Sequence, residues 1–236
     1  MERAASYRKR PYRAHGSSAY ITMNVSSKLL KSDIFGRVWL NSDQRIVRDV
    51  TAARKWARPL AHWLMAREAR ALAALDGLDG VPAILSVGSD QLERQFIDGL
   101  PMHKAKPREP AYYREALRLL RQVHRMGVVH NDLAKEPNWL VTSAGEPALI
   151  DFQLAAFMPR RGWWFRVMAR EDIRHLLKHK RTYCPERLTA RQKDMLANPA
   201  GPWKIWMRLF KPVYLFVTRR LLGWADREGA HERSGN

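Results

Sequence analysis

The sequence predicts an α+β fold with a small β-rich N-terminal lobe and a mostly helical C-terminal lobe. Between about residues 20 and 100, short runs with strand-like composition surround a single helical stretch. The longer helical patterns, at 110–127 and beyond 165, fall in the second half of the chain. The apolar fraction of 46% over 236 residues is enough for one sizeable core and too high for a disordered chain.

The N-terminal half divides into a flexible basic arm at 1–19 and the β-rich lobe at 20–99. In that lobe, FGRVWL (35–40) and RIVRDV (45–50) predict two strands joined by the turn-like NSDQ. HWLMAREARALAAL (62–75) has the apolar spacing and the strong helix formers of an α-helix. GVPAILSVG and LERQFIDGL predict further strands, and DGLPM closes the lobe as a turn.

The C-terminal lobe is expected at 100–200. Residues 110–127 begin with Pro and end with Gly, as helices commonly do, and their apolar residues recur every three or four positions. NWLVT and PALID predict two short strands around the turn SAGE. Beyond residue 165 the pattern is helical again, and 201–236 is a separate basic segment rich in aromatic residues.

The net charge and the cysteine content limit which binding partners and which cellular compartment are expected. The 42 Lys and Arg against 23 Asp and Glu give a net charge of +19, which indicates a polyanion nearby. Nucleic acid, anionic lipid headgroups and phosphorylated sugars all qualify, but no zinc-finger, RRM or KH signature selects nucleic acid. The single cysteine excludes an intramolecular disulfide, and the N-terminus lacks the apolar core of a signal peptide. We therefore expect a cytoplasmic protein.

Three polar residues are spaced in a way that favours a metal site. Asn138 follows Asp132 by six residues, and Asp151 follows Asn138 by thirteen. Two predicted strands lie between Asn138 and Asp151, so a hairpin can bring them together. Carboxylate and amide oxygens suit Mg²⁺, and Mg²⁺ in turn suits phosphate.

The stretch VVHNDLAKEPNWLV (128–141), followed by LIDFQ, resembles the catalytic loop and the metal-binding segment of protein-kinase-like phosphotransferases. The resemblance implies a two-lobed protein-kinase-like fold that uses ATP and Mg²⁺. It implies that Asp132 is the base for the acceptor hydroxyl and that Lys135 neutralises charge on the transferred phosphoryl group. It assigns the metal to Asn138 and Asp151.

The same resemblance extends upstream. Glu68 in REARAL matches the helix glutamate that pairs with a strand lysine, and Arg48 stands in the place of that lysine. Gly36 in IFGRV stands where the phosphate-covering loop is expected. RQFIDG (94–99), with Gln95 and Ile97, matches the linker whose backbone groups meet adenine.

Further residues are given supporting roles. His130 is expected to fix the loop through hydrogen bonds, and Phe152 to pack beneath the metal site. Asp172 in REDIRHLLKHK resembles the helix aspartate that supports the catalytic loop in compact kinases. Because no peptide-gripping segment precedes it, the resemblance points to the compact bacterial branch. That branch comprises RIO-type serine/threonine kinases and the kinases that phosphorylate Kdo or heptose in lipopolysaccharide.

The chain also departs from the pattern of the family. Gly36 stands alone where three glycines are usual, and Arg48 is a larger, fork-shaped cation than lysine. The loop between Asp132 and Asn138 is one residue longer than usual. Gln153 replaces the glycine of the metal-binding segment, which restricts its movement. Asn131 replaces the arginine that reads a phosphorylated activation loop, so no such switch is expected.

These observations predict a kinase for a hydroxyl acceptor, with a lipopolysaccharide core sugar favoured and a protein Ser/Thr close behind. A pseudokinase or nucleotide-binding adaptor at the membrane surface is the alternative, and a nucleic-acid-associated kinase rests on charge alone. Residues 202–224 carry an apolar stripe with basic residues beside it, which suits either a membrane interface or ordinary core packing. RRGWWFR (160–166) is a second basic aromatic cluster. Both favour a peripheral position on the inner face of the inner membrane.

Overall fold

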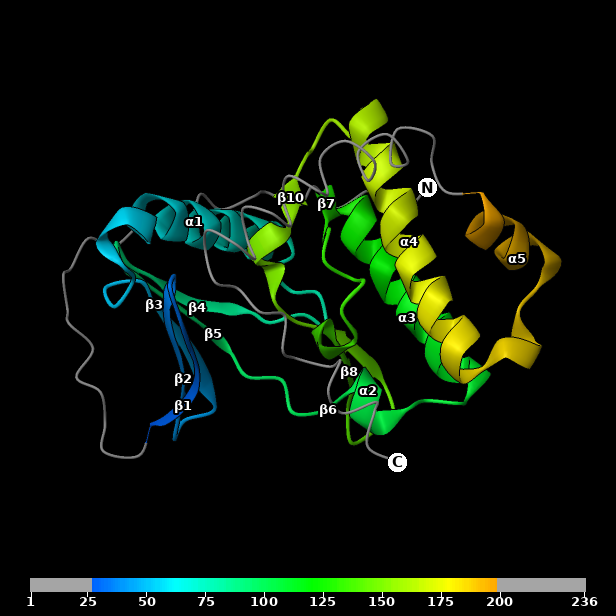
Figure 1. The fold of residues 1–236 in the computed structure, drawn as a ribbon, viewed down its shortest axis with the longest axis horizontal. Helices are drawn as coiled ribbons and strands as arrows, with labels where there is room; N and C mark the ends of the chain where they lie inside the picture. Colours follow the sequence, from blue (N-terminus) through cyan, green and yellow to red (C-terminus); the bar gives the residue numbers. More distant parts are fainter. Residues whose placement is uncertain (1–26, 199–236) are drawn as a thin grey trace, which may run out of the picture.

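The computed structural model describes residues 27–198, which form two lobes lying side by side (Figure 1). The N-terminal lobe contains a five-stranded sheet and one long helix, and the C-terminal lobe is dominated by helices. The predicted α+β fold with a β-rich and a helical lobe is therefore confirmed. The predicted arm at 1–19 and the basic aromatic segment at 201–236 lie outside the described residues.

The N-terminal sheet is antiparallel throughout, in the order β1-β2-β3-β5-β4. Its strands are β1 (Lys28–Asp33), β2 (Gly36–Asn41), β3 (Arg45–Asp49), β4 (Ile84–Val87) and β5 (Gln91–Gln95). The predicted strands at 35–40 and 45–50 are confirmed as β2 and β3. β1 has no counterpart in the sequence prediction, because this edge strand is mostly exposed and lacks alternating apolar residues.

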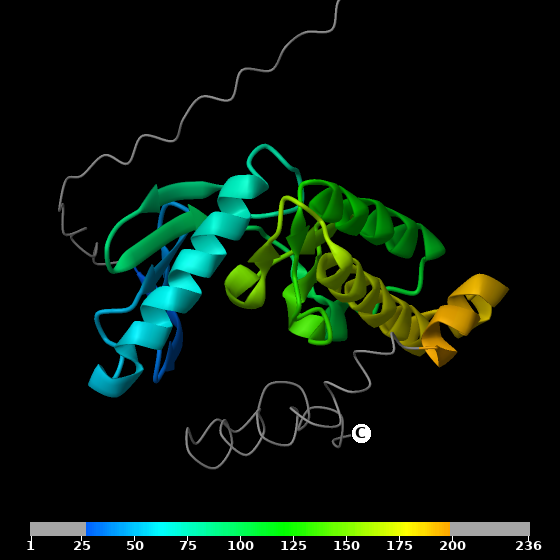
Figure 2. The same ribbon diagram turned by 90° about the horizontal axis from the view of Figure 1, so that it is seen from above.

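The helix α1 (Arg58–Ala74) packs against the sheet and follows the short 3₁₀ turn η1 (Lys55–Ala57). It begins before the predicted residue 62, because Pro59 is suited to the first turn of a helix. Ala61, Leu64 and Met65 form a core cluster with Leu92 of β5. Figure 2 shows α1 crossing the sheet.

The C-terminal lobe is built on two long helices, α3 and α4. Its helices are α2 (Met102–Ala105), α3 (Pro110–Arg125), α4 (Trp163–Tyr183) and α5 (Ala190–Ala197). Its strands are β6 (Leu100–Pro101), β7 (Val128–Val129), β8 (Trp139–Val141), β9 (Pro147–Leu149) and β10 (Ala156–Phe157). Its 3₁₀ turns are η2 (Glu136–Asn138), η3 (Phe152–Leu154) and η4 (Pro185–Arg187). The predicted helix at 110–127 and the strand pair β8–β9 are confirmed.

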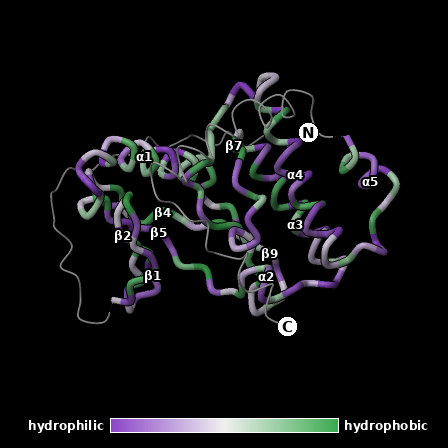
Figure 3. The backbone as a smooth tube through the Cα atoms, viewed as in Figure 1, coloured by the Kyte–Doolittle hydropathy of each residue, from purple (hydrophilic) through white to green (hydrophobic). Residues whose placement is uncertain are grey.

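The main core lies between α3, α4 and the β8–β9 hairpin. Figure 3 shows hydrophobic and hydrophilic residues alternating along the two helices. Leu120 and Leu176 come from the two helices, and Trp139 and Leu149 come from the hairpin. Because β7 and β8 are both buried in the lobe, the polar residues between them are anchored at each end. This loop carries most of the predicted site.

The chain passes between the lobes through a short linker, residues 96–99, between β5 and β6. The one cysteine, Cys184, is free and buried at the end of α4. Within residues 27–198, every helix is too short or too polar to cross a membrane.

Candidate functional site

The loop between β7 and β8 brings three of the predicted residues into direct contact. The Nδ2 of Asn138 donates to the carbonyl oxygen of Asp132 at 2.9 Å and to its Oδ2 at 3.1 Å. The Nζ of Lys135 lies 3.0 Å from the same Oδ2. Because Asn138 uses its amide N–H groups for these bonds, its Oδ1 is the atom left to serve as a metal ligand.

Asp151 comes next to this cluster at the end of the β8–β9 hairpin. The N–H of Ile150 donates to the carbonyl oxygen of Asn138 at 3.1 Å, which joins the two segments. Asp151 has a left-handed backbone, with φ of 64°, a conformation that Asp tolerates better than most residues. Its Oδ1 is buried and has no hydrogen-bond partner among the described residues. A buried carboxylate oxygen without a partner is unfavourable unless a hydrogen-bond donor or a cation of a ligand contacts it.

The charges around Asp151 keep it ionised. Burial by itself favours the protonated form, but the positive charges of Arg48, Arg94, Lys31 and Lys135 outweigh burial and keep its pKa below the ordinary value. The carboxylate is therefore available as an anionic ligand at neutral pH.

Asp132 is shifted in the opposite direction. Burial raises the pKa of the Asp132 carboxyl above its ordinary value, and the nearby charge of Asp151 adds to the rise. The charge and the hydrogen bond of Lys135 offset part of this effect. Two carboxylates whose pKa values are pushed apart suit two different roles, and the more basic of the pair suits proton acceptance.

His130 and Phe152 support the loop from beneath. The Nε2 of His130 lies 3.0 Å from the carbonyl oxygen of Ile150, so the imidazole links the loop to the residue before Asp151. Both side chains are fully buried, and their ring centroids lie 4.6 Å apart. These contacts agree with the supporting roles that the resemblance implied.

Asp172 of α4 holds the start of the loop. Its Oδ2 accepts a hydrogen bond from the N–H of His130 at 2.8 Å, and its Oδ1 accepts one from the N–H of Asn131 at 3.0 Å. The Nε2 of His124 lies 3.2 Å from Oδ2. One buried carboxylate therefore satisfies two backbone donors of the loop.

Replacing Asp172 with Ala should destabilise the protein by about 2–6 kcal/mol, because two backbone N–H groups lose their partners at about 1–3 kcal/mol each. Denaturant unfolding followed by circular dichroism measures this change. The matched control is Asp76→Ala, at an exposed position, where the free energy of unfolding should change by no more than about 0.5 kcal/mol. Equal stability of the two variants would contradict the supporting role of Asp172.

Asn131, to which the sequence assigned no role, has a geometric one. Its φ is 64°, in the left-handed region that Asn enters more readily than most residues. Its Nδ2 donates to the carbonyl oxygen of Leu154 at 3.1 Å, beyond the metal-binding segment. Asn131 therefore forms the tight turn before Asp132 and ties it to η3.

The additional residue between Asp132 and Asn138 is accommodated in the 3₁₀ turn η2. The N–H of Asn138 donates to the carbonyl oxygen of Lys135 at 3.2 Å, which closes the turn. Glu136 then points to α4, where the hydroxyl of Tyr183 donates to its Oε2 at 2.6 Å. The longer loop thus gains an anchor on α4 while Asn138 still reaches Asp132.

In the N-terminal lobe, Glu68 of α1 is paired with two arginines. The Nη1 of Arg48 lies 3.5 Å from Oε2 of Glu68, and the Nε of Arg94 lies 3.1 Å from Oε1. Arg48 and Arg94 stand on one face of neighbouring strands, since Arg48 pairs with Leu92 and Ile46 pairs with Arg94. The pairing of Arg48 with Glu68 was predicted, whereas Arg94 was not.

These contacts are ion pairs without hydrogen-bond geometry, because neither Glu68 oxygen nor the Arg94 Nε has a hydrogen-bond partner among the described residues. The cluster carries two positive charges against one negative, and its cations act on Asp151. A buried cationic cluster with unused donors is suited to phosphate oxygens.

Gly36 lies in the hairpin between β1 and β2, as expected for a phosphate-covering loop. Its φ is 127°, and a Cβ at this position would collide with the carbonyl oxygen of Asp49. Glycine is therefore required here by the close approach of β2 to Asp49 at the end of β3. Its role towards a nucleotide stays a prediction.

Gln95, the last residue of β5, and Ile97 of the linker differ in what they can offer to adenine. The N–H of Gln95 already donates to the carbonyl oxygen of Ala83 at 2.8 Å. Ile97 makes no backbone–backbone hydrogen bond within the part of the chain that the structure describes. Ile97 is therefore the better candidate for a backbone contact with a base.

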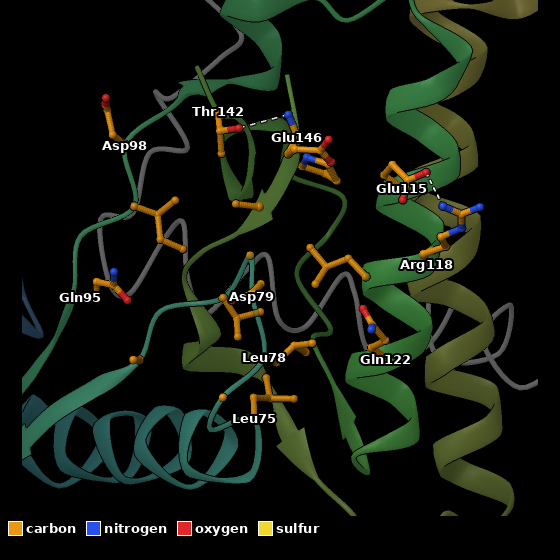
Figure 4. Close-up of a pocket in the computed structure, with 18 of the residues that line it drawn as sticks. Leu75, Leu78, Asp79, Gln95, Asp98, Glu115, Arg118, Gln122, Thr142 and Glu146 are labelled. Atoms are coloured by element: carbon orange, nitrogen blue, oxygen red, sulfur yellow. Dashed lines mark hydrogen bonds and ion pairs between the residues drawn. The ribbon is translucent and has the colours of Figure 1, made fainter. Parts of the chain in front are cut away.

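A cavity of about 670 Å³ adjoins the linker but not the catalytic loop (Figure 4). It is lined by residues of the segment after α1, of the end of β5 and the linker, of α3 and of the β8–β9 hairpin, including Gln95, Asp98, Glu115, Gln122 and Glu146. None of Arg48, Asp132, Asn138 and Asp151 lines it. The cavity thus meets the predicted adenine-binding residues Gln95 and Ile97, but not the predicted phosphate and metal residues.

Arg67 of α1 is a further site residue that the sequence did not reveal. Its Nη2 donates to the carbonyl oxygens of Leu154 at 2.9 Å and Ala155 at 3.0 Å, and its Nε donates to the latter at 3.1 Å. Arg67 therefore ties α1 to the segment that follows Asp151. Its partners are 87 and 88 residues away in sequence, so no local pattern could indicate them.

The donor set fits a magnesium ion. Asn138 and Asp151 supply an amide oxygen and an ionised carboxylate, and Mg²⁺ is usually bound by one or two such protein ligands together with substrate phosphates and water. No group of three or more His, Cys, Asp or Glu side chains suited to a metal occurs among residues 27–198. An ion held by Asn138 and Asp151 would be completed by phosphate oxygens and water.

No protein-family model and no curated protein matches the chain. Among solved structures, the chain is similar to the Rio2 kinase from Chaetomium thermophilum, with a TM-score of 0.49 and 15% sequence identity. The similarity covers 67% of this chain and 57% of that chain. The sheet with one helix, joined by a short linker to a helical lobe, is the two-lobed arrangement that the sequence predicted. A fold does not assign an activity by itself, so the chemistry has to be argued from the site's own residues.

Proposed function

We propose that the protein is an ATP- and Mg²⁺-dependent phosphotransferase that acts on a hydroxyl acceptor. The observation that carries this proposal is the contact of Asp132 with Asn138 and Lys135, beside an Asp151 carboxylate with an unpaired oxygen. These groups provide a proton acceptor, a cation and a pair of metal ligands within one loop and one hairpin. Phosphoryl transfer needs these components, since its catalysis is mostly positioning and charge stabilisation.

Each residue of the site has a defined task in this proposal. Asp132 orients the acceptor hydroxyl and takes its proton, which its raised pKa favours. Lys135 stabilises the negative charge of the transferred group. Asn138 and Asp151 hold Mg²⁺, which neutralises phosphate charge when it is bound. Arg48 binds phosphate oxygens while Glu68 holds it in place.

We favour a lipopolysaccharide core sugar as the acceptor, with a protein Ser or Thr as the second candidate. In the structure, only residues 158–162 separate β10 from α4. This short connection leaves little chain beside the site for gripping an extended peptide. Because a sugar hydroxyl on a phosphorylated glycolipid is surrounded by negative charge, the basic composition of the chain also favours it.

Phosphate transfer from labelled ATP distinguishes these acceptors. The full chain is incubated with Mg²⁺ and either dephosphorylated lipopolysaccharide, which offers free sugar hydroxyls, or a protein extract. Label that enters lipopolysaccharide and stays there after protease treatment supports the glycolipid acceptor. Label confined to protein would instead support the serine/threonine acceptor.

A pseudokinase is the second candidate function, and the replacement of lysine by Arg48 favours it. A guanidinium is bulkier than an ammonium group, and Arg48 already forms a buried ion pair with Glu68. Nucleotide binding without transfer to any acceptor would support this reading. The convergence of Asp132, Asn138 and Asp151 argues against it, because binding alone does not require a proton acceptor.

A further inference from the structure

Most of the exposed aromatic side chains of the described residues occur on two neighbouring segments. Trp56, Leu60 and Trp63 lie on η1 and α1, and Phe157, Trp163 and Trp164 lie on β10 and the start of α4. We call these six residues the tryptophan face. Their side chains are between 41% and 59% exposed. All the exposed tryptophans of residues 27–198 belong to this face.

The two segments lie beside each other. Arg67 stacks over the ring of Trp63 at 4.5 Å and donates to the carbonyl oxygen of Ala155, directly before β10. The first turns of α4 pack on the same strand, since Phe165 shares a core cluster with Ala156. Figure 1 shows α1, β10 and the start of α4 along one edge, and Figure 2 views this edge from above.

Spacing on α1 places the three apolar residues on one stripe. Trp56, Leu60 and Trp63 are four and three positions apart, so they follow one side of the helix. The opposite side of α1, with Ala61 and Met65, is buried against the sheet. The stripe is therefore the outer surface of a packed helix, and it is convex.

The surroundings of the face are strongly basic. The exposed basic residues next to it are Arg54, Lys55, Arg58, Arg70, Arg160, Arg161 and Arg166. None of them forms an ion pair with an acidic residue in the described part of the chain. The only acidic residue between positions 51 and 75 is Glu68, which is buried with Arg48, and there is none between 153 and 170. Nothing in these segments balances their charge.

We propose that the tryptophan face is a docking surface for an anionic phospholipid bilayer. Tryptophan is favoured at membrane interfaces, where its apolar ring and its polar N–H both find suitable surroundings. Basic residues beside apolar ones add attraction to anionic headgroups. A convex surface that includes Leu60 fits a lipid layer better than a nucleic-acid strand, which binds in basic grooves.

Docking through this face has a consequence for the site. The segment with Trp163 and Trp164 follows Asp151 by a dozen residues, and the next residue, Phe165, packs in one cluster with Val129, directly before the catalytic loop. A bilayer that contacts this segment lies beside the catalytic loop. The inference does not depend on phosphoryl transfer, because lipid binding is measured without ATP.

Vesicle co-sedimentation of the full chain tests the proposal. Vesicles of phosphatidylethanolamine with phosphatidylglycerol should bind the protein, and vesicles of phosphatidylcholine alone should bind it much less. Trp63→Ser combined with Trp164→Ser should lower partitioning at least about ten-fold, because two large apolar side chains no longer enter the interface. The matched control is Leu85→Ser with Leu100→Ser, two exposed apolar residues on β4 and β6, which should leave partitioning unchanged.

A second variant tests the charges without touching the tryptophans. Arg160→Glu with Arg166→Glu should lower partitioning more than about twenty-five-fold, since each basic residue near anionic lipid contributes about five-fold. Melting temperatures equal to that of the parent protein show that the variants fold. Unchanged vesicle binding by both variants would overturn the proposal, as would complete loss on substituting Trp206 and Trp224 in the 202–224 segment alone. Loss of RNA binding with intact vesicle binding would assign the face to nucleic acid instead.

Discussion

The Asp132→Asn variant should transfer phosphate about 10²–10⁴-fold more slowly than the parent protein, because it lacks the general base. Asn is nearly the same size and still offers an oxygen to the Nδ2 of Asn138, so the loop should keep its shape. The affinity for Mg²⁺-ATP should therefore change little. Initial rates with labelled ATP at saturating acceptor measure the effect.

Asp76→Asn provides the matched control, since it removes one carboxylate from an exposed position without altering the site. Its rate should equal that of the parent protein. If Asp132→Asn and the parent transfer phosphate equally fast, Asp132 is not the base. If neither the parent protein nor Asp132→Asn transfers phosphate to any acceptor while both bind nucleotide, the protein is a pseudokinase and not an enzyme.

The Asp151→Asn variant should lose the Mg²⁺ dependence of nucleotide binding. We expect the enhancement of ATP affinity by Mg²⁺ to fall more than about 100-fold, since residues merely supporting a metal ligand already contribute 10–100-fold. Asn is chosen because it tolerates the left-handed backbone at this position, whereas Ala would add strain. Titration calorimetry with and without Mg²⁺ measures the change.

For the affinity of metal-free ATP, we expect the opposite effect of the Asp151→Asn variant. Asp151 balances the charges of Arg48, Arg94, Lys31 and Lys135, so its loss exposes these cations to the phosphates. Metal-free ATP should bind at least as tightly as to the parent protein. An Mg²⁺ dependence equal to that of the parent would show that Asp151 is not a metal ligand.

Much of the C-terminal half of the site could be predicted because its residues are close in sequence. Asp132, Lys135 and Asn138 lie on one loop, and a single hairpin connects Asn138 to Asp151. Local spacing then almost determines which side chains meet. The strands β8 and β9 were equally visible, because their apolar runs are short and bounded by turn residues.

The parts that could not be predicted depend on contacts between distant elements. Arg94 reaches Glu68 because of the register of β5 against β3, and Arg67 reaches Leu154 because of the way α1 meets the other lobe. Neither register nor helix orientation is encoded in a local pattern. Asn131 was missed for a different reason, since its role depends on a backbone angle rather than on its side chain alone.

The position of Arg67 next to Glu68 has a mechanical consequence for α1. Neighbouring residues of this helix are fastened to the sheet through Arg48 and to the start of the β10 segment through Leu154 and Ala155. Swinging the helix outward would break both attachments in the same movement. We therefore expect α1 to keep this position, with the ion pair between Arg48 and Glu68 always formed. The rate of the proposed reaction would then depend on the supply of acceptor and not on a movement of this helix.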